Sequence, residues 1–264
     1  MEERSLLETL KQDWLSLPLL ASEHGADVDM FIIYIHALML ALFVGWFAYF
    51  CLAVWKFSAK RNPKADHVGV RSHASTWLEV AVAVVEAILL LGIAIPMWAK
   101  QADKFPDEKE SEVVRITAEQ FTWNSRYSGP DKTFGKQNAR LASQANPLAY
   151  DLDDPAGKDD VTPPVKDIRV PVNKNVIVHL TSKDVIHSFK VNTLRVCQDA
   201  IPGMSITLHF KANHPGRYLI TCAQLCGNGH SSMNGWITVE SQVNFDAWLV
   251  ANKSKTGGAP VSFE

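Results

Sequence analysis

Apolar residues are unevenly distributed along the chain and gather in two long runs near its beginning. Residues 30–55 contain no Asp, Glu, Lys or Arg, and residues 77–99 contain only two charged side chains, both glutamates. Each run is longer than the roughly 20 residues with which a helix crosses the ~30 Å hydrocarbon core of a bilayer. Helices buried in a globular core are rarely this long and this uniformly apolar. The pattern therefore predicts a transmembrane hairpin, with helices at about 30–56 and 76–99.

The charges that flank the two runs predict the orientation of the hairpin. Residues 56–76, between the runs, carry five basic residues and one acid, whereas residues 1–29 carry seven acids and two basic residues. Because basic loops tend to stay in the cytoplasm, we expect the loop there and both chain ends on the outer side. The first 29 residues also lack the basic start, apolar stretch and small-residue site of a cleaved signal peptide.

After residue 100 the pattern changes to short runs rich in β-branched and aromatic residues, separated by turn formers such as Pro202-Gly203 and Pro215-Gly216. Short strands at this spacing favour an antiparallel sandwich or barrel. The runs lie at residues 113–116, 167–172, 176–180, 205–210, 217–221 and 235–240.

One long polar segment interrupts these runs. It is rich in Gly, Pro, Asn and Asp, shows no period, and predicts a surface excursion or a partner-binding loop. The tail after Trp248 is predicted to be loose. The expected organisation is an outward N-terminal segment, a helical hairpin, a β domain with one long loop, and a flexible tail, at residues 1–29, 30–99, 100–250 (loop at about 127–165) and 251–264.

The residues that can carry chemistry are concentrated in one short segment. Two cysteines four residues apart are followed by a histidine and then a methionine, namely Cys222, Cys226, His230 and Met233. Thiolate and thioether sulfurs select copper over hard cations, while imidazole serves several metals. The net charge of −2 and the pI near 6.5 lack the basic footprint that nucleic-acid binding leaves. The sequence thus points to a metal site and away from nucleic acid.

Four kinds of site compete for these residues. A disulfide between the cysteines can form in an oxidising compartment, but it leaves the histidine and the methionine without a role. A zinc site has no need of the methionine, and a one-copper blue site takes only one cysteine. Two copper ions bridged by both thiolates use every ligand but lack one imidazole. His187, in a predicted loop after the run at 176–180, supplies it.

Three segments of the sequence resemble subunit II of haem–copper cytochrome c oxidases, at residues 184–189, 198–204 and 222–233. The likeness extends over most of the chain, because that family also has a membrane hairpin followed by an outward cupredoxin-like β domain. The resemblance implies a dinuclear copper A centre and a location in the bacterial inner membrane, with both termini on the periplasmic side.

The resemblance also implies a ligand set for two copper ions. One copper would be held by His187 and Met233, and the other by His230 and a backbone carbonyl, with both cysteines bridging the pair. The implied metal-binding residues are His187, Cys222, Gln224 (through its carbonyl), Cys226, His230 and Met233.

The implied role is to accept electrons from a c-type cytochrome and pass them to haem in oxidase subunit I. There oxygen is reduced to water and protons are pumped, so the chain is expected to be part of an enzyme without a catalytic oxygen site of its own. The implied partners are subunits I and III, membrane lipid and the cytochrome, and a supercomplex with a permanently docked donor stays open.

Two positions depart from the family pattern. The family commonly has Glu where this chain has Gln224, and a neutral amide is a poorer ligand for a hard cation, which argues against magnesium at the subunit I interface. The family also tends to place Trp, the usual point at which the electron enters, where this chain has Phe121. Phe121 and the neighbouring Trp123 are therefore the candidates for electron acceptance. Cys197 is expected to be an unpaired, buried thiol.

Acidic residues raise two further questions. Glu79 and Glu86 lie in the second apolar run, where carboxylates are costly and are functional candidates. Glu79 matches the family's Glu at the mouth of a proton-uptake route, whereas Glu86 is expected to face the partner subunit. Other acids could steer a basic cytochrome, although solvated surface is the simpler interpretation, at Asp153, Asp154, Asp159, Asp160 and Asp184.

Three functional alternatives remain at this point. The chain could be the copper subunit of a related nitric oxide reductase, because the reaction chemistry lies in another chain. It could be a membrane-anchored copper-binding or copper-delivery protein without a catalytic partner. A receptor with a zinc-stabilised β domain is the third, and it predicts a colourless protein.

Overall fold

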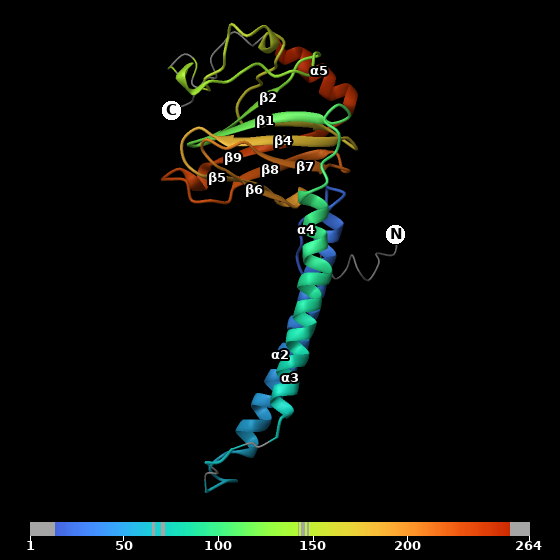
Figure 1. Cartoon of the computed structure of the whole chain (residues 1–264), viewed down its shortest axis with the longest axis vertical. Helices are drawn as coiled ribbons and strands as arrows, with labels where there is room; N and C mark the ends of the chain where they lie inside the picture. Colours follow the sequence, from blue (N-terminus) through green and yellow to red (C-terminus); the bar gives the residue numbers. More distant parts are fainter. Residues whose placement is uncertain are drawn as a thin grey trace. The chain divides into compact units, whose positions relative to one another are not determined.

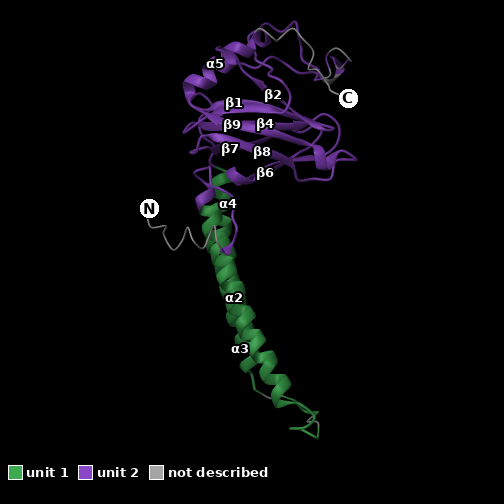
Figure 2. Ribbon diagram, turned by 180° about the vertical axis from the view of Figure 1, so that it is seen from behind, with its two compact units in different colours: residues 1–11, 27–103 green, residues 12–26, 104–264 purple. Residues whose placement is uncertain are grey.

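The computed structural model describes residues 14–64, 67–69, 72–141, 143, 146 and 148–253. The chain divides into two units (Figure 2). Unit 1 contains residues 1–11 and 27–103, and unit 2 contains residues 12–26 and 104–264. The first 13 residues of the predicted outward segment lie outside the described residues, as does most of the predicted tail, 254–264.

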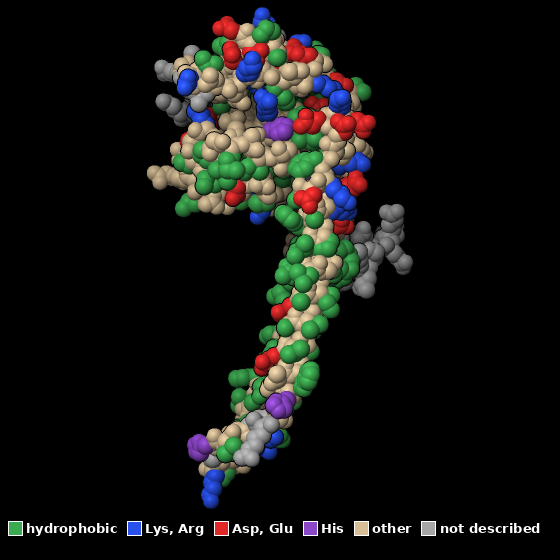
Figure 3. Space-filling model, in the orientation of Figure 1, with side chains coloured by type: hydrophobic (Ala, Val, Ile, Leu, Met, Phe, Trp, Pro, Cys, Tyr) green, Lys and Arg blue, Asp and Glu red, His purple; other side chains and the backbone are tan. Residues whose placement is uncertain are grey.

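Unit 1 consists of two long helical segments. The first is α2 (Gly25–Lys56), and the second runs without a break through α3 (Ala74–Ala87), the π-helix η2 (Ile88–Ala94) and α4 (Ile95–Ala102). Both are long and apolar enough to cross a membrane. Many of their large hydrophobic side chains are exposed, and Figure 3 shows hydrophobic side chains along the length of these helices. Such a surface is stable in a nonpolar environment about as thick as a bilayer, which is what a transmembrane hairpin occupies.

Both segments extend a few residues beyond the apolar runs. α2 begins at Gly25 rather than near residue 30, and its first turn contains Asp27, whose negative charge is favourable at a helix N-terminus. The second segment continues to Ala102, and Lys100 in its last turn pairs with Asp27 at 2.9 Å. Polar end turns of this kind are invisible to a search for apolar residues.

Unit 2 is a β domain built from two sheets, with strand orders β2-β1-β4-β7 and β3-β9-β8-β5-β6 (Figure 1). The inner faces of both sheets contribute to one hydrophobic core. The predicted all-β, cupredoxin-like sandwich after a helical pair is confirmed. The strands are β1 Glu112–Glu119, β2 Thr122–Tyr127, β3 Asp167–Pro171, β4 Asn175–Ser182, β5 His187–Val191, β6 Val196–Ala200, β7 Ile206–Lys211, β8 Gly216–Cys222 and β9 Asn234–Glu240.

The six predicted runs all fall in strands, but the sheets differ from the prediction in two ways. β1 pairs with β4, and β3 with β9, in parallel, so the sheets are mixed and not purely antiparallel. The strands β2, β5 and β6 and the C-terminal helix α5 (Gln242–Lys253) were not predicted. β2 escaped the pattern because its consecutive polar residues Asn124, Ser125 and Arg126 are all buried.

The long polar loop is folded against the β domain and is more than a simple surface excursion. Tyr127 and Val161 exchange two backbone hydrogen bonds of 2.9 Å, which close its base. Inside it, Asp160 forms a buried ion pair with Arg126 of β2, at 2.5 Å. Leu148 is also buried. The loop also contains two short 3-10 turns, η3 (Ala139–Leu141) and η4 (Pro155–Gly157).

Part of the predicted outward N-terminal segment belongs to the β domain. Ala21 and Ser22 are completely buried there. The Ala21 N–H donates to Thr193 O at 2.8 Å, and the Ser22 hydroxyl donates to Leu194 O at 2.6 Å. At the other end of the chain α5 carries ordered structure past Trp248, since Asn252 is buried. The sandwich therefore recruits residues from both ends of the sequence.

Candidate metal centre

The predicted ligands come from two neighbouring strands of one sheet and the loop between two of its strands. His187 is the first residue of β5, not a loop residue, and Cys222 is the last residue of β8. The loop after Cys222 contains Gln224 and Cys226 and leads into a 3-10 turn, η6 (His230–Ser232). Met233 follows that turn and directly precedes β9. His187 is far from this loop in the sequence, but the pairing of β5 with β8 places it beside the loop.

These residues place six donor groups close together, and we call them the metal cluster. The two cysteine sulfurs are 3.8 Å apart, and Cys222 and Cys226 are free thiols, so no disulfide joins them. Cys222 Sγ lies 4.0 Å from His187 Nδ1 and 3.1 Å from the carbonyl oxygen of Gln224. Cys226 Sγ lies 3.5 Å from His230 Nδ1 and 3.7 Å from Met233 Sδ. Each cysteine sulfur therefore has an imidazole nitrogen within 4.0 Å.

The metal cluster is largely shielded from solvent. His187 is 0% exposed and Met233 is 1% exposed, and both cysteines are buried. His230 is half-buried, while Gln224 is exposed and offers its backbone carbonyl inward. The donors of His187, Cys222 and Cys226 lie within 4.8 Å of one another, which is close enough to share a metal.

A second layer of hydrogen bonds fixes the ligands. Asp184 Oδ1 lies 2.9 Å from Nε2 of His187 and so leaves Nδ1 facing the sulfurs. The other Asp184 oxygen accepts from the backbone N–H of Gln120 at 2.8 Å. Burial acts to raise the pKa of Asp184, but hydrogen bonds from Gln120, His187 and Val185 outweigh it and lower that pKa. A carboxylate behind a histidine is the usual way to orient a metal-binding imidazole.

Gln120 also reaches the ligand loop directly, and its role was not predicted. Its side-chain Nε2 donates to the carbonyl of Cys226 at 2.6 Å. The adjacent Phe121 ring fills the space beside Gly227 and Gly229, where a Cβ would clash with it. Gly227 has φ +131°, a conformation that side chains disfavour. The only signal for Gln120 in the sequence was its position beside the aromatic candidates.

The charge state of the sulfurs also suits a cation. Burial, together with the neighbouring Cys222 thiol, raises the pKa of Cys226 to about 11. A metal ion between the sulfurs would offset this cost, because coordinated thiols lose their protons. Two thiols, two imidazoles, a thioether and a carbonyl form a soft donor set that fits copper. The residues present therefore fit the copper pair that the resemblance implies.

The two aromatic candidates for electron acceptance have different environments. Trp123 of β2 is completely buried, with its ring 6.3 Å from that of His187 and 5.4 Å from that of Phe189. Phe121 is only partly buried and packs against the core beside the ligand loop. Glu79 and Glu86 are exposed on α3 of unit 1.

Three residues behave differently from the sequence-based interpretation. Cys197 on β6 is exposed and not buried, because its side chain points out of a strand whose neighbours Val196 and Ala200 face the core. Asp160 and Asp184 are not free surface acids. The first is buried against Arg126, so it cannot steer a soluble partner as a solvated charge. The second is exposed but is also bonded to His187.

Comparisons with known proteins point in one direction. A protein-family model described as the periplasmic domain of cytochrome c oxidase subunit II matches residues 156–243. The chain is 31% identical over 217 residues to an alternative cytochrome c oxidase subunit 2 of Bradyrhizobium diazoefficiens, covering 82% of this chain and 76% of that protein. It is 30% identical over 213 residues to cytochrome c oxidase subunit 2 of Cereibacter sphaeroides, covering 75% of this chain and 66% of that protein.

Solved structures include a similar chain as well. The crystal structure of the periplasmic domain of cytochrome oxidase subunit II of Bradyrhizobium japonicum is 28% identical, with a TM-score of 0.42. It covers 58% of this chain and 99% of that chain.

Proposed function

This chain belongs to the cytochrome c oxidase subunit II family, and we propose that it transfers electrons through a dinuclear copper centre to a haem-bearing subunit I. Two copper ions would supply one-electron redox chemistry. The ligands would be the side chains of His187, Cys222, Cys226, His230 and Met233, with the carbonyl of Gln224.

The observation that carries this proposal is the pairing of each cysteine with a different histidine. Cys222 faces His187 at 4.0 Å, and Cys226 faces His230 at 3.5 Å, across a sulfur–sulfur distance of 3.8 Å. A one-copper blue site would use a single thiolate and leave the other idle. A zinc site would leave Met233 unused. Two metals that share both sulfurs use all of these groups.

The chain's own residues keep the ligands in place during electron transfer. Asp184 holds the His187 ring and Gln120 holds the Cys226 carbonyl, while burial keeps water away from the sulfurs. A site whose ligands are fixed in both oxidation states reorganises little, and hydrogen bonding and solvent exclusion also tune its redox potential. This arrangement supports fast transfer without any bond being made or broken in the chain.

Electron acceptance is proposed at Phe121 in preference to Trp123. Phe121 is partly exposed and lies beside the ligand loop at Gly227 and Gly229. Trp123 is sealed in the core behind His187, so a soluble donor cannot touch it. A c-type cytochrome would therefore dock over the ligand loop, with Phe121 at its edge.

The remaining parts of the proposal concern placement and partners. The two helical segments cross the bacterial inner membrane, with the loop between them in the cytoplasm and unit 2 in the periplasm. Subunit I, with subunit III, contacts the helices, and Glu79 lies at the proton-uptake side. An exposed amide at Gln224 argues against a magnesium ion at the subunit I interface.

A purified oxidase complex tests the function directly. Affinity-tagged chain should co-purify with a haem-bearing membrane protein, and the complex should oxidise reduced cytochrome c. Rapid mixing should show haem reduction following the copper absorbance change. Cys222→Ser should stop haem reduction, whereas the matched exposed-cysteine variant Cys197→Ser should leave its rate unchanged. A chain that purifies alone with readily exchanged copper would instead support a copper-delivery protein.

A further inference from the structure

A row of basic side chains crosses the outer face of the sheet β2-β1-β4-β7. Arg115 of β1 is the register partner of Arg126 on β2 and of His179 on β4. Side chains of directly paired residues lie about 5 Å apart at Cβ, so like charges opposite each other destabilise a sheet. A row with two arginines therefore requires negative charge from elsewhere.

Arg126 receives that charge from within the chain. Its guanidinium pairs with Asp160 at 2.5 Å and stacks on Tyr150, with 4.0 Å to the ring centroid. The backbone N–H of Gly135 also donates to Asp160, at 3.0 Å. The folded polar loop thus neutralises the first arginine of the row in a buried environment.

Arg115 has no such partner. It donates one hydrogen bond to Gly135 O at 3.3 Å and stacks over Phe134 with 4.3 Å to the ring centroid. Among the described residues no carboxylate lies within ion-pair distance of it. A guanidinium has five N–H donors, so most of its hydrogen-bonding capacity is unused by the protein. Burial and the nearby Arg126 lower the pKa of Arg115, and the more distant charges of Asp160 and Glu108 offset this only in part.

A cavity of about 660 Å³ opens beside Arg115. Its floor comes from two adjacent cross-strand rows of β1 and β4, and its walls come from the polar loop and the β6–β7 connection. No Asp or Glu is among the described residues that line it. The lining side chains that can donate hydrogen bonds are Arg115, Thr117, Lys136, Gln137, His179, Thr181 and Ser205, and we call this cavity the basic groove.

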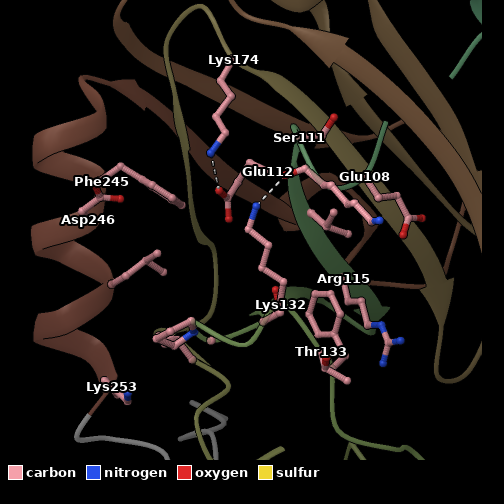
Figure 4. A pocket seen from close by; sticks show the side chains of 18 of the residues that line it. Glu108, Ser111, Glu112, Arg115, Lys132, Thr133, Lys174, Phe245, Asp246 and Lys253 are labelled. Carbon is pink, nitrogen blue, oxygen red and sulfur yellow. Dashed lines mark hydrogen bonds and ion pairs between the residues drawn. The ribbon is translucent and has the colours of Figure 1, made fainter. Parts of the chain in front are cut away.

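The neighbouring cavity differs from the basic groove in the residues that line it. It measures about 760 Å³ and shares Arg115 and His179 with the groove, but it also contains acids. Glu112 pairs there with Lys174 at 3.4 Å, and in Figure 4 the guanidinium of Arg115 points away from this pair. His179 lies between Thr207 and the exposed Glu108, so both of its ring nitrogens already have partners. The first cavity is lined by three acids and five Lys or Arg residues, whereas the groove is lined by Arg115 and Lys136 with no acid. Asp160 and Asp154 accept hydrogen bonds from the backbone N–H groups of Gly135 and Lys136, so their carboxylates lie behind the lining.

We propose that the basic groove binds a small oxyanion with two or more negative charges, of the phosphate or polycarboxylate class. The forked guanidinium of Arg115 matches two oxygens of such a group, and the hydroxyls of Thr117 and Thr181 offer hydrogen bonds from the floor. Lys136 adds an exposed positive charge at the rim. None of these residues belongs to the metal cluster, so the site is separate from electron transfer.

Calorimetric titration of the purified oxidase complex with pyrophosphate and, separately, with citrate tests the proposal at low ionic strength. One saturable site per chain is expected for at least one of them, and the stronger ligand assigns the class. Arg115→Gln should weaken binding about tenfold or more, the usual loss for a charge-assisted hydrogen-bonded pair. Arg217→Gln is the matched control, because Arg217 also lies on a strand over an aromatic ring, Trp236 at 4.4 Å, and should change affinity less than about twofold.

A second variant keeps the test decisive if Arg115→Gln does not fold. Lys136 is exposed, so Lys136→Gln should retain the thermal unfolding midpoint and lower the affinity by a few-fold. The proposal is overturned if neither anion binds saturably to the unmodified complex. Equal weakening by Arg115→Gln and Arg217→Gln, or no weakening by Lys136→Gln when Arg115→Gln is unfolded, also overturns it.

Discussion

The metal cluster and the basic groove lie in the same β domain but use opposite chemistry. The metal cluster gathers thiols, imidazoles and a thioether in a buried place where Asp184 and Gln120 fix the ligands. The basic groove gathers N–H and O–H donors on an open sheet face, where most donors of Arg115 stay unused. This is the difference expected between a site for a resident redox group, which needs fixed ligands and exclusion of water, and a site for an exchangeable anion, which needs access from solvent.

The largest expected effect concerns the metal cluster. Cys226→Ser removes one bridging sulfur, and a hydroxyl is a poor replacement for a thiolate toward copper. Steady-state oxidation of cytochrome c by the complex should fall to about 1% or less. The control Cys197→Ser changes an exposed cysteine of β6 and should keep full activity. Substantial residual activity in Cys226→Ser would mean that electron transfer does not need this sulfur, and would contradict the role proposed for the metal cluster.

The second effect concerns the row of arginines under the basic groove. Asp160→Asn leaves Arg126 charged and unpaired in a buried position, which should cost about 3 kcal/mol or more in the free energy of unfolding. Asp153 lies in the same loop but is exposed, so Asp153→Asn should cost less than about 0.5 kcal/mol. Chemical denaturation of the full chain in detergent measures both. Equal stability of the two variants would mean that Arg126 is not neutralised by Asp160.

A third effect sharpens the role of rigidity in the metal cluster. Asp184→Asn should release the His187 ring and weaken copper affinity about 10- to 100-fold, as loss of a second-layer carboxylate does. Competition with a chelator of known affinity measures the change. Asp199→Asn alters an exposed acid on the adjacent strand β6 and should leave copper affinity unchanged. Identical affinities would remove the supporting role of Asp184.

The smallest effect concerns the acid-containing cavity beside the basic groove. Burial raises the pKa of Glu112 above its usual value of 4.5, although Lys174 opposes this. Between pH 4.5 and the folded-state pKa, Glu112 keeps its proton in the folded state but has lost it in the unfolded state. The stability that Glu112 contributes at lower pH is therefore lost as the pH rises through its folded-state pKa. Glu112→Gln should flatten the fall of the unfolding midpoint between pH 4.5 and that pKa. An unchanged pH profile would contradict the shift.

The two sites also differ in how far the sequence predicts them. Four side-chain ligands of the metal cluster lie within residues 222–233, so their spacing alone indicated a metal, and the missing imidazole led to His187. The basic groove depends on which residues of β1 and β4 stand opposite each other, as Arg115 and His179 do. Register of that kind is fixed by tertiary pairing and leaves no local pattern.

The same reasoning explains what was missed in the fold. The membrane helices and six strands follow from periodic or continuous apolar residues, which sequence patterns detect. β2 was missed because Asn124 and Arg126 are polar yet buried. Asn124 donates a hydrogen bond to Thr117 O, and Arg126 forms an ion pair with Asp160. The long loop is ordered by that same buried ion pair, whose partners lie 34 positions apart and show no motif.

The central claim is that the metal cluster would hold two copper ions with both cysteines among their ligands, and one measurement tests it most directly. The full chain, reconstituted with copper in detergent, should bind two copper ions by metal analysis. In electron paramagnetic resonance it should show a single unpaired electron delocalised over two equivalent copper nuclei, and Cys197→Ser should give the same spectrum. A stoichiometry of one copper, with the signal of a single copper nucleus, would contradict the claim.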